Sequence, residues 1–216
     1  MRQASGTTQT KSRHAGKNTL RIIAGLWRGR RLQFPDVPGL RPTPDRVRET
    51  VFNWLQAWVA AEDCLDLYAG SGACGLEALS RGARTVVFVD ASPLATSAIT
   101  QNLALLENAP GYTGHATVTH MRAEVWLKAS GSLAQYGEHG FGLVFLDPPF
   151  ADGVLNTSCQ QLECSGLLKP RAHIYVESGD PLPQPGLSAD FPVNWRLLKS
   201  ARAGSVFYGL YLREQT

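Results

Sequence analysis

Residues 65–75 read LDLYAGSGACG, and this stretch decides the fold. Gly70, Gly72 and Gly75 have the spacing GxGxxG, directly after an apolar segment and directly before a helical pattern. Glycines in such a turn let a ligand approach the backbone closely. Asp90 ends the next apolar segment, 20 residues after Gly70, where a carboxylate can accept hydrogen bonds from both hydroxyls of a ribose. The stretch therefore predicts a strand, a turn and a helix that bind a nucleoside-containing cofactor.

The sequence around this unit alternates between strand and helix patterns. Strands are expected at 64–68, 85–89, 116–119, 142–146 and 173–177, and helices at 73–80, 92–106, 124–128 and 153–163. Residues 195–199 and 205–212 indicate a closing β-hairpin. The alternation predicts an α/β fold with a doubly wound, mostly parallel sheet and one antiparallel strand near the C-terminus.

The N-terminal part has a different pattern. Residues 20–34 predict a β-hairpin with a basic tip. Thr43 is expected to cap a helix that has Pro44 in its first position and an apolar face reaching Val59. Trp54 and Trp58 share that face, so we interpret both as core residues. We divide the chain into a basic arm over 1–19, the hairpin and helix over 20–60, and an α/β domain over 61–216.

Composition narrows the class of protein. The 216 residues are 44% hydrophobic and 18% charged, which is typical of a globular protein. No apolar run approaches the about 20 residues of a membrane helix, and the first residues lack a signal peptide, so a cytoplasmic protein is expected. None of the four cysteines belongs to a CxxC pair. We therefore expect reduced, mostly buried thiols, against the alternative of a zinc site or a disulfide framework.

Charge is distributed unevenly along the chain. Residues 1–50 carry 11 Lys and Arg against 3 acidic residues, while residues 51–216 carry 10 against 15. This asymmetry favours a polyanionic partner for the N-terminal part, the alternative being a solvated tail.

Asp66 distinguishes between the two cofactor classes that the glycine turn can serve. It lies four residues before Gly70, where it would face the pyrophosphate of NAD with like charge. S-adenosylmethionine carries a cationic amino group and no phosphate. The sequence therefore favours S-adenosylmethionine over NAD, and over a glycine turn without a ligand.

A second motif follows the strand expected at 142–146, where the chain reads Asp147-Pro148-Pro149-Phe150. In an open α/β sheet ligands bind at the carboxyl ends of the strands, so this turn is expected beside the glycine turn. Two prolines remove two backbone donors and leave carbonyl acceptors. Together with Asp147, they can accept both hydrogens of a planar NH2 group, which frees its lone pair for methylation, and Phe150 can stack on an unpaired base. The alternative is a simple Pro-Pro turn.

With these motifs the chain resembles the RsmD family, class I S-adenosylmethionine-dependent methyltransferases that act on the N2 amine of one guanine in 16S ribosomal RNA. The resemblance extends over about residues 20–213. It is carried by RIIAGLWRGR at 21–30, GLRPTPDRVRETVFNWL at 39–55, the glycine turn with its helix to residue 83, the Asp147–Phe150 turn, and IYVES at 174–178.

The resemblance implies roles for individual residues. The catalytic residues would be Asp147, Pro148, Pro149 and Phe150, and the cofactor would be bound by Asp66, Tyr68, Gly70, Gly72, Asp90, Ala91, Arg122 and Ala123. Arg122 departs from the Asn or Asp that the family has before the alanine. A basic surface would hold rRNA phosphates next to the site through Arg28, Arg30, Arg31, Arg41, Arg46 and Arg48.

The resemblance implies a monomer without a metal that acts on 16S rRNA, in the small ribosomal subunit or its assembly intermediate. Segment 20–60 would then be the RNA-contacting extension and 61–216 the methyltransferase domain. Three alternatives remain: a DNA adenine-N6 methyltransferase, a non-catalytic RNA-binding assembly factor, and an NAD oxidoreductase.

Overall fold

The computed structural model describes residues 18–36, 43–129, 140–150, 154–183 and 191–214, so most of the arm over 1–19 and the expected helix start at 153 lie outside the described residues. The strands of these ranges are β1 (Asn18–Arg21), β2 (Arg31–Phe34), β3 (Asp63–Asp66), β4 (Thr85–Asp90), β5 (His115–His120), β6 (Phe141–Leu146), β7 (Leu168–Ser178), β8 (Trp195–Ala203) and β9 (Val206–Arg213). The helices are α1 (Asp45–Leu55), α2 (Ala73–Ser80), α3 (Pro93–Leu106), α4 (Ala123–Ala129) and α5 (Leu155–Cys164).

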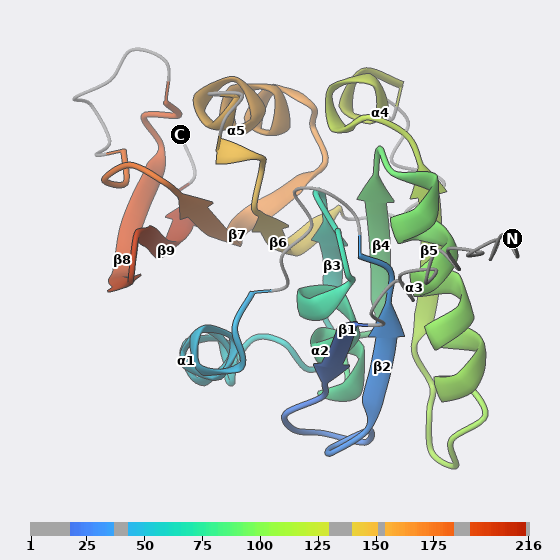
Figure 1. The fold of residues 1–216 in the computed structure, drawn as a ribbon. Helices are drawn as coiled ribbons and strands as arrows, with labels where there is room; N and C mark the ends of the chain where they lie inside the picture. Colours follow the sequence, from blue (N-terminus) through green and yellow to red (C-terminus); the bar gives the residue numbers. More distant parts are fainter. Residues whose placement is uncertain (1–17, 37–42, 130–139, 151–153, 184–190, 215–216) are drawn as a thin grey trace, which may run out of the picture.

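The main sheet has seven strands in the order β5-β4-β3-β6-β7-β9-β8 (Figure 1). Only β9 runs against its neighbours, which confirms the predicted single antiparallel strand near the C-terminus. The chain builds outward from β3 through β4 to β5, and then from β6 to β7 on the other side. The reversal lies between β3 and β6, and such a switch point is where open α/β sheets bind ligands.

Side chains alternate between the two faces of the sheet, as the strand period requires. In β6, Leu143 and Phe145 pack with α1, α2 and α3 in one core cluster, while Val144 and Leu146 pack with α4 and α5 in a second. The β1–β2 hairpin contributes Leu20 and other side chains to the first cluster. The N-terminal segment and the sheet therefore share one hydrophobic core.

A buried ionic cluster ties the N-terminal segment to α2. The carboxylate of Glu77 accepts hydrogen bonds from the backbone N–H groups of Ile23 and Ala24, at 2.8 and 3.0 Å, and from Arg81. Arg48 lies 3.6 Å from the same carboxylate, and the side chains of Arg48 and Glu77 are both fully buried. The prediction that Arg48 contacts RNA is therefore wrong, because its guanidinium group points inward from α1 to partners on α2 and the hairpin.

Gly25 shows how closely the hairpin loop approaches α2. Its φ is +80°, and a Cβ atom added there would lie 1.9 Å from the carbonyl oxygen of Ser80. The backbone N–H groups of Leu26 and Trp27 donate to the carbonyl and the hydroxyl of Ser80, respectively. The loop is therefore fixed against the C-terminal end of α2.

The predicted start of α1 needs correction. Thr43 does not cap the helix; Pro44 occupies the N-cap without a side-chain hydrogen bond, and the helix ends at Leu55 rather than Val59. The hydroxyl of Thr43 donates instead to Glu177, at 2.9 Å. The hydroxyl donates to a buried carboxylate, which is a strong acceptor, and this contact joins the segment before α1 to the end of β7.

Other predictions have mixed outcomes. Trp54 is partly buried in the first core cluster, whereas Trp58 is 42% exposed and stacks on His173, so the prediction of a core position is wrong for Trp58. The four thiols are free, and only Cys164 is exposed. Among the described residues no helix is long and apolar enough to cross a membrane.

Candidate active site

Four carboxyl groups gather at the carboxyl ends of the central strands, on the face covered by α1 and α2. Asp66 is in register with Phe88 and Phe145, and Phe145 is in register with Tyr175. Asp90, Asp147 and Glu177 each follow one of these residues by two positions, so the strand period points them to the same face. Parallel strands end at one edge of the sheet, and the site therefore joins residues from four strands.

The glycine turn has the backbone that its sequence predicts. Gly70 and Gly72 have φ angles of +52° and +75°, in the region that favours glycine. Gly75 has a packing role, because a Cβ atom there would lie 2.2 Å from the ring of Phe88. The third glycine of the motif thus lets α2 lie against β4.

Two backbone N–H groups, one of them in the glycine turn, fix the side chain of Asp90. Its Oδ2 accepts a hydrogen bond from the N–H of Gly70 and its Oδ1 one from the N–H of Ser92, both at 2.7 Å. A carboxylate has about four acceptor sites, so each oxygen keeps capacity for a hydroxyl donor. Asp90 is partly exposed, and its orientation is fixed before any ligand arrives.

Asp66 is buried at the start of α2, where its Oδ2 accepts a hydrogen bond of 2.9 Å from the N–H of Gly75. Burial, with smaller contributions from the negative charges of Asp90 and Glu177, raises the pKa of Asp66 from 3.8 to about 7, although the Gly75 hydrogen bond opposes this. No cationic side chain of the described residues forms an ion pair with it. A buried carboxylate without a cation fits the amino group of S-adenosylmethionine.

This raised pKa predicts how the stability of the ligand-free protein depends on pH. The native state binds the Asp66 proton more tightly than the unfolded state, so the stability it contributes is present below about pH 4 and is lost as pH rises through 7. We expect Asp66→Asn to raise the free energy of unfolding by about 1–3 kcal/mol at pH 8 and to change it little at pH 4. Urea unfolding at both pH values measures this.

Cofactor affinity provides the opposing readout for the same substitution. Asp66→Asn removes the negative charge that would pair with the cofactor's amino group, so the dissociation constant of S-adenosylmethionine should rise while stability rises. The difference in free energy of unfolding between Asp66→Asn and the wild type is compared at the two pH values. If the variant is less stable than the wild type at pH 8 and not at pH 4, the raised pKa of Asp66 is contradicted.

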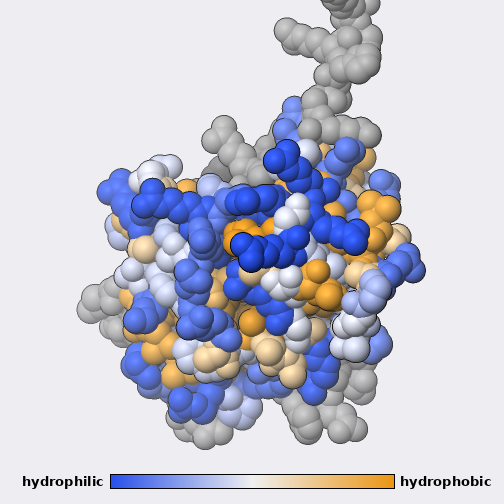
Figure 2. All heavy atoms as spheres, turned by 90° about the horizontal axis from the view of Figure 1, so that it is seen from below, coloured by the Kyte–Doolittle hydropathy of each residue, from blue (hydrophilic) through white to orange (hydrophobic). Residues whose placement is uncertain are grey.

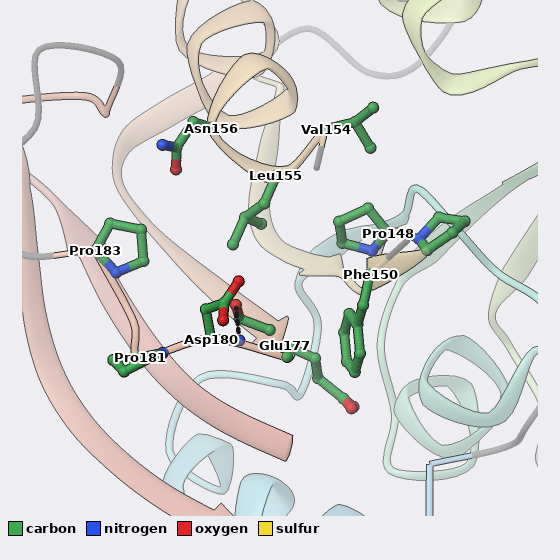
Figure 3. Close-up of a pocket in the computed structure, with 12 residues that line it drawn as sticks. Pro148, Phe150, Val154, Leu155, Asn156, Glu177, Asp180, Pro181 and Pro183 are labelled. Carbon is green, nitrogen blue, oxygen red and sulfur yellow. Dashed lines mark hydrogen bonds between the residues drawn. The ribbon is translucent and has the colours of Figure 1, made fainter. Parts of the chain in front are cut away.

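The Asp147 turn forms one wall of a cavity of about 300 Å³ (Figure 3). The lining includes Pro148, Pro149 and Phe150 of the turn, residues 154–156 at the start of α5, and residues 177–181 at the end of β7. Phe150 is 45% exposed, and its ring rests against Gly179. The cavity thus has an accessible aromatic surface on which a flat ligand can stack.

Asp147 itself has no charge partner in the part of the chain that the structure describes. Burial first, and then the negative charges of Glu177 and Asp66, raise its pKa well above the usual range. Among the described residues it forms neither a hydrogen bond nor an ion pair. It is half-buried rather than fully buried, so a ligand that reaches it can supply the missing donors.

Glu177 is a site residue to which the sequence reasoning gave no role. It is 4% exposed, lines the cavity, and accepts hydrogen bonds on Oε1 from Thr43 and from the hydroxyl of Tyr175. Burial raises its pKa, and the two hydroxyl donors oppose this. A carboxylate at the end of the apolar run Ile174–Val176, in the strand next to Asp147, is the signal that identifies it.

The remaining predicted cofactor residues are distributed over two places. Ala91 follows Asp90, and its carbonyl accepts a hydrogen bond of 3.0 Å from Nε2 of His120. Ala123 is the buried first residue of α4, and the Arg122 side chain is 75% exposed and paired with Glu124. Tyr68 packs against the second core cluster, where its hydroxyl lies 2.7 Å from that of Ser158 on α5. The structure does not bring Tyr68 to the Asp66 face.

The predicted basic surface is divided between two regions. Because α2 runs antiparallel to β3, the hairpin loop with Arg28 and Arg30 lies against the end of α2 at the edge of the sheet opposite the four carboxyl groups (Figure 1). The expectation that they lie next to the site is therefore wrong. Figure 2 shows that edge, where hydrophilic side chains surround isolated hydrophobic ones. Arg31 is exposed on β2, and Arg46 is exposed in the first turn of α1, whose start is joined to Glu177 of the site through Thr43. Arg41 lies outside the described residues.

No group of three or more His, Cys, Asp or Glu side chains in the described ranges could hold a metal ion.

Comparisons with known proteins agree with this geometry. A family model described as "Conserved hypothetical protein 95" matches residues 20–212. Ribosomal RNA small subunit methyltransferase D of Escherichia coli K12 is 43% identical over 204 residues, covering 94% of this chain and 95% of the relative. The solved structure of the Escherichia coli protein yhhF has a TM-score of 0.77 at 42% identity, covering 91% of this chain and 99% of that one. A SAM-dependent methyltransferase of Agrobacterium tumefaciens, with a TM-score of 0.56 at 17% identity over 81% of this chain and 56% of that one, shares the fold alone.

Proposed function

The chain belongs to the family of ribosomal RNA small subunit methyltransferase D, and on this basis we propose that it transfers a methyl group from S-adenosylmethionine to the N2 amine of a guanine in 16S rRNA. One observation supports the amine as the target. Asp147, a carboxyl group without a donor among the described residues, stands beside two backbone carbonyls and an exposed aromatic ring. This arrangement suits a flat base that carries an NH2 group.

The residues that would hold the cofactor are those at the ends of β3 and β4. Asp66 would pair with the amino group and Asp90 would accept hydrogen bonds from the ribose, while the glycine turn lets the cofactor lie against the backbone. S-adenosylmethionine supplies an electrophilic methyl group on a sulfonium centre.

The Asp147 turn would orient the nucleophile. The Asp147 carboxylate and the Pro148 carbonyl accept the two N–H groups of the amine, which turns its lone pair toward the methyl group. As the nitrogen–carbon bond forms, the carbon–sulfur bond breaks and its electrons stay on sulfur. The product ammonium then releases one proton to water, so no strong base is required. Most of the rate enhancement would come from alignment.

The exposed arginines would bind rRNA in two places. Arg46 would contact phosphates next to the target nucleotide, and the hairpin residues Arg28, Arg30 and Arg31 would contact a more distant segment. Segment 20–60 would thus still be an RNA-contacting extension, with one contact region on α1 and a second on the hairpin.

We expect the triple variant Arg28→Gln, Arg30→Gln, Arg31→Gln to raise KM for small subunits and to leave kcat nearly unchanged. The slope of log KM against log salt concentration should fall in magnitude by about 2, because about 0.7–0.9 is expected for each phosphate contact. Initial rates at several salt concentrations measure this. Arg196→Gln on the edge strand β8 is the control and should leave the slope unchanged. Equal slopes for the triple variant and the wild type would show that the hairpin does not touch rRNA.

Mass spectrometry of nucleosides from 16S rRNA, in strains with and without the gene, tests the proposed function. One N2-methylguanine should disappear without the gene, return with the wild-type gene, and stay absent with the Asp147→Ala gene. Unchanged 16S rRNA would overturn the assignment of the substrate. Loss of N6-methyladenine from DNA in the same extracts would favour the DNA methyltransferase alternative.

A further inference from the structure

Asp147 and Glu177 form a pair of carboxyl groups for which the described residues supply few donors. Val176 is in register with Leu146, so the next residues, Glu177 and Asp147, end neighbouring strands side by side. The two groups lie close enough for the negative charge of Glu177 to raise the pKa of Asp147. Two buried carboxylates repel each other unless donors or cations lie between them.

The two oxygens of Glu177 differ. Oε1 accepts hydrogen bonds from Thr43, at 2.9 Å, and from Tyr175, at 2.8 Å. Oε2 accepts none from the described residues. The hydroxyls come from Thr43, which directly precedes the N-cap of α1, and from Tyr175 on β7 itself, so the carboxyl group is fixed from two sides. In Figure 3 it points away from Leu155 and α5, past the ring of Phe150. Oε2 of Glu177 is therefore an oriented acceptor on the same face of the sheet as Asp147.

Guanine has the complementary edge. Its N2 amine and its N1–H are adjacent donors, which can each donate to one carboxyl group of a neighbouring pair. Adenine offers an exocyclic amine next to N1, but its N1 is an acceptor and would oppose the lone pairs of Glu177. A pair of carboxyl groups thus accepts guanine and disfavours adenine, whereas a single one would accept either amine.

We propose that Glu177 determines the choice of base by accepting the N1–H of the target guanine on Oε2, while Asp147 accepts from the N2 amine. This rests on the proposed function. Glu177 then acts as a specificity residue, and Thr43 and Tyr175 act as positioning residues that hold its other oxygen. Thr43, two residues before α1, also links the N-terminal helix to Glu177, the residue that reads the base.

The test compares guanine with 2-aminopurine, which keeps the 2-amine but has an acceptor at N1. The substrates are small subunits with either base at the position that nucleoside mapping identifies. For each enzyme the ratio of kcat/KM on guanine to kcat/KM on 2-aminopurine is measured. The intrinsic difference between the two amines, and the absent O6, affect wild type and variant alike, so they cancel when ratios are compared.

We expect Glu177→Gln to lower this ratio by about tenfold or more, because a glutamine amide can donate to N1 of 2-aminopurine and a hydrogen bond to a charged acceptor is lost on guanine. Asp180→Asn, at another carboxyl group that lines the cavity, is the matched control and should leave the ratio unchanged. The dissociation constant of S-adenosylmethionine should stay near the wild-type value in both variants.

The outcomes separate the possibilities. Equal losses on both bases in Glu177→Gln would overturn the proposal and leave Glu177 a structural residue. A fall of the ratio in Asp180→Asn alone would transfer the role to Asp180. If Glu177→Gln does not fold, Tyr175→Phe, which removes one donor to Oε1, should lower the ratio by a smaller factor, and an unchanged ratio again refutes the proposal. A wild-type enzyme that is inactive on the guanine substrate would instead refute the proposed function.

Discussion

Asp147→Ala is expected to lower the rate of methyl transfer by about a hundredfold to a thousandfold, the range found when one preorganised polar group is removed from an active site. The expectation rests on the isolation of this carboxyl group among the described residues, which leaves its acceptor capacity for the substrate amine. Without it, only backbone carbonyls would orient the NH2 group, and its lone pair would remain delocalised into the base.

The same variant should fold and bind the cofactor. Burial and the neighbouring charges of Glu177 and Asp66 raise the pKa of Asp147, so its ionised form is disfavoured in the native state without a ligand, and its removal should not weaken the fold. Single-turnover transfer from labelled cofactor to undermethylated small subunits measures the rate, and calorimetry measures S-adenosylmethionine binding. Equal losses of transfer and cofactor binding would mean that Asp147 mainly serves the cofactor. Glu107→Ala, on the exposed end of α3, is the control for removal of a charge.

Glu77→Ala is expected to reduce the free energy of unfolding by about 3–5 kcal/mol, the range for breaking a buried ion pair on one side. Two backbone N–H groups of the hairpin loop, Arg81 and the fully buried Arg48 all direct donors or charge at this carboxylate. The Nη1 atom of Arg48 has no hydrogen-bond partner among the described residues, so losing Glu77 leaves a buried charge with less compensation.

Urea unfolding at neutral pH measures this loss. Glu77→Gln keeps the size of the side chain and an acceptor, so it should lose less than Glu77→Ala. Glu107→Ala, which removes an exposed carboxylate, should lie within about 0.5 kcal/mol of the wild type. A loss below about 1 kcal/mol in Glu77→Ala would mean that hydrophobic contacts alone hold the hairpin against α2.

Local patterns predicted most of the fold and half of the site. The glycine turn, the carboxylate at the end of β4 and the Asp147 turn each consist of neighbouring residues at the end of a strand, and parallel strands bring those ends to one edge. Strand and helix periods are likewise local, so the α/β alternation and the single antiparallel strand were predictable. The ends of the segments were harder to predict. For example, β7 begins at Leu168, five residues before the apolar run that predicted it.

The arginine-rich segment shows where such patterns are insufficient. Arg46 and Arg48 lie two residues apart in one helix, yet Arg46 is exposed and Arg48 is fully buried against Glu77. Nothing in the local sequence separates an exposed arginine from one in an internal ion pair. An arginine is buried if it lies on the side of α1 that faces α2, and exposed if it does not. How the whole helix packs on the core determines which side that is.

The sequence by itself thus determined the fold class, the glycine turn and the place of the Asp147 turn at a strand end, because each depends on residues close together in the chain. Only the tertiary structure decided that Thr43 serves Glu177, 134 positions away, and that the hairpin arginines lie at the edge opposite the carboxyl groups. Such contacts depend on the direction in which each element crosses the sheet, and on which buried polar groups must find partners once water is excluded.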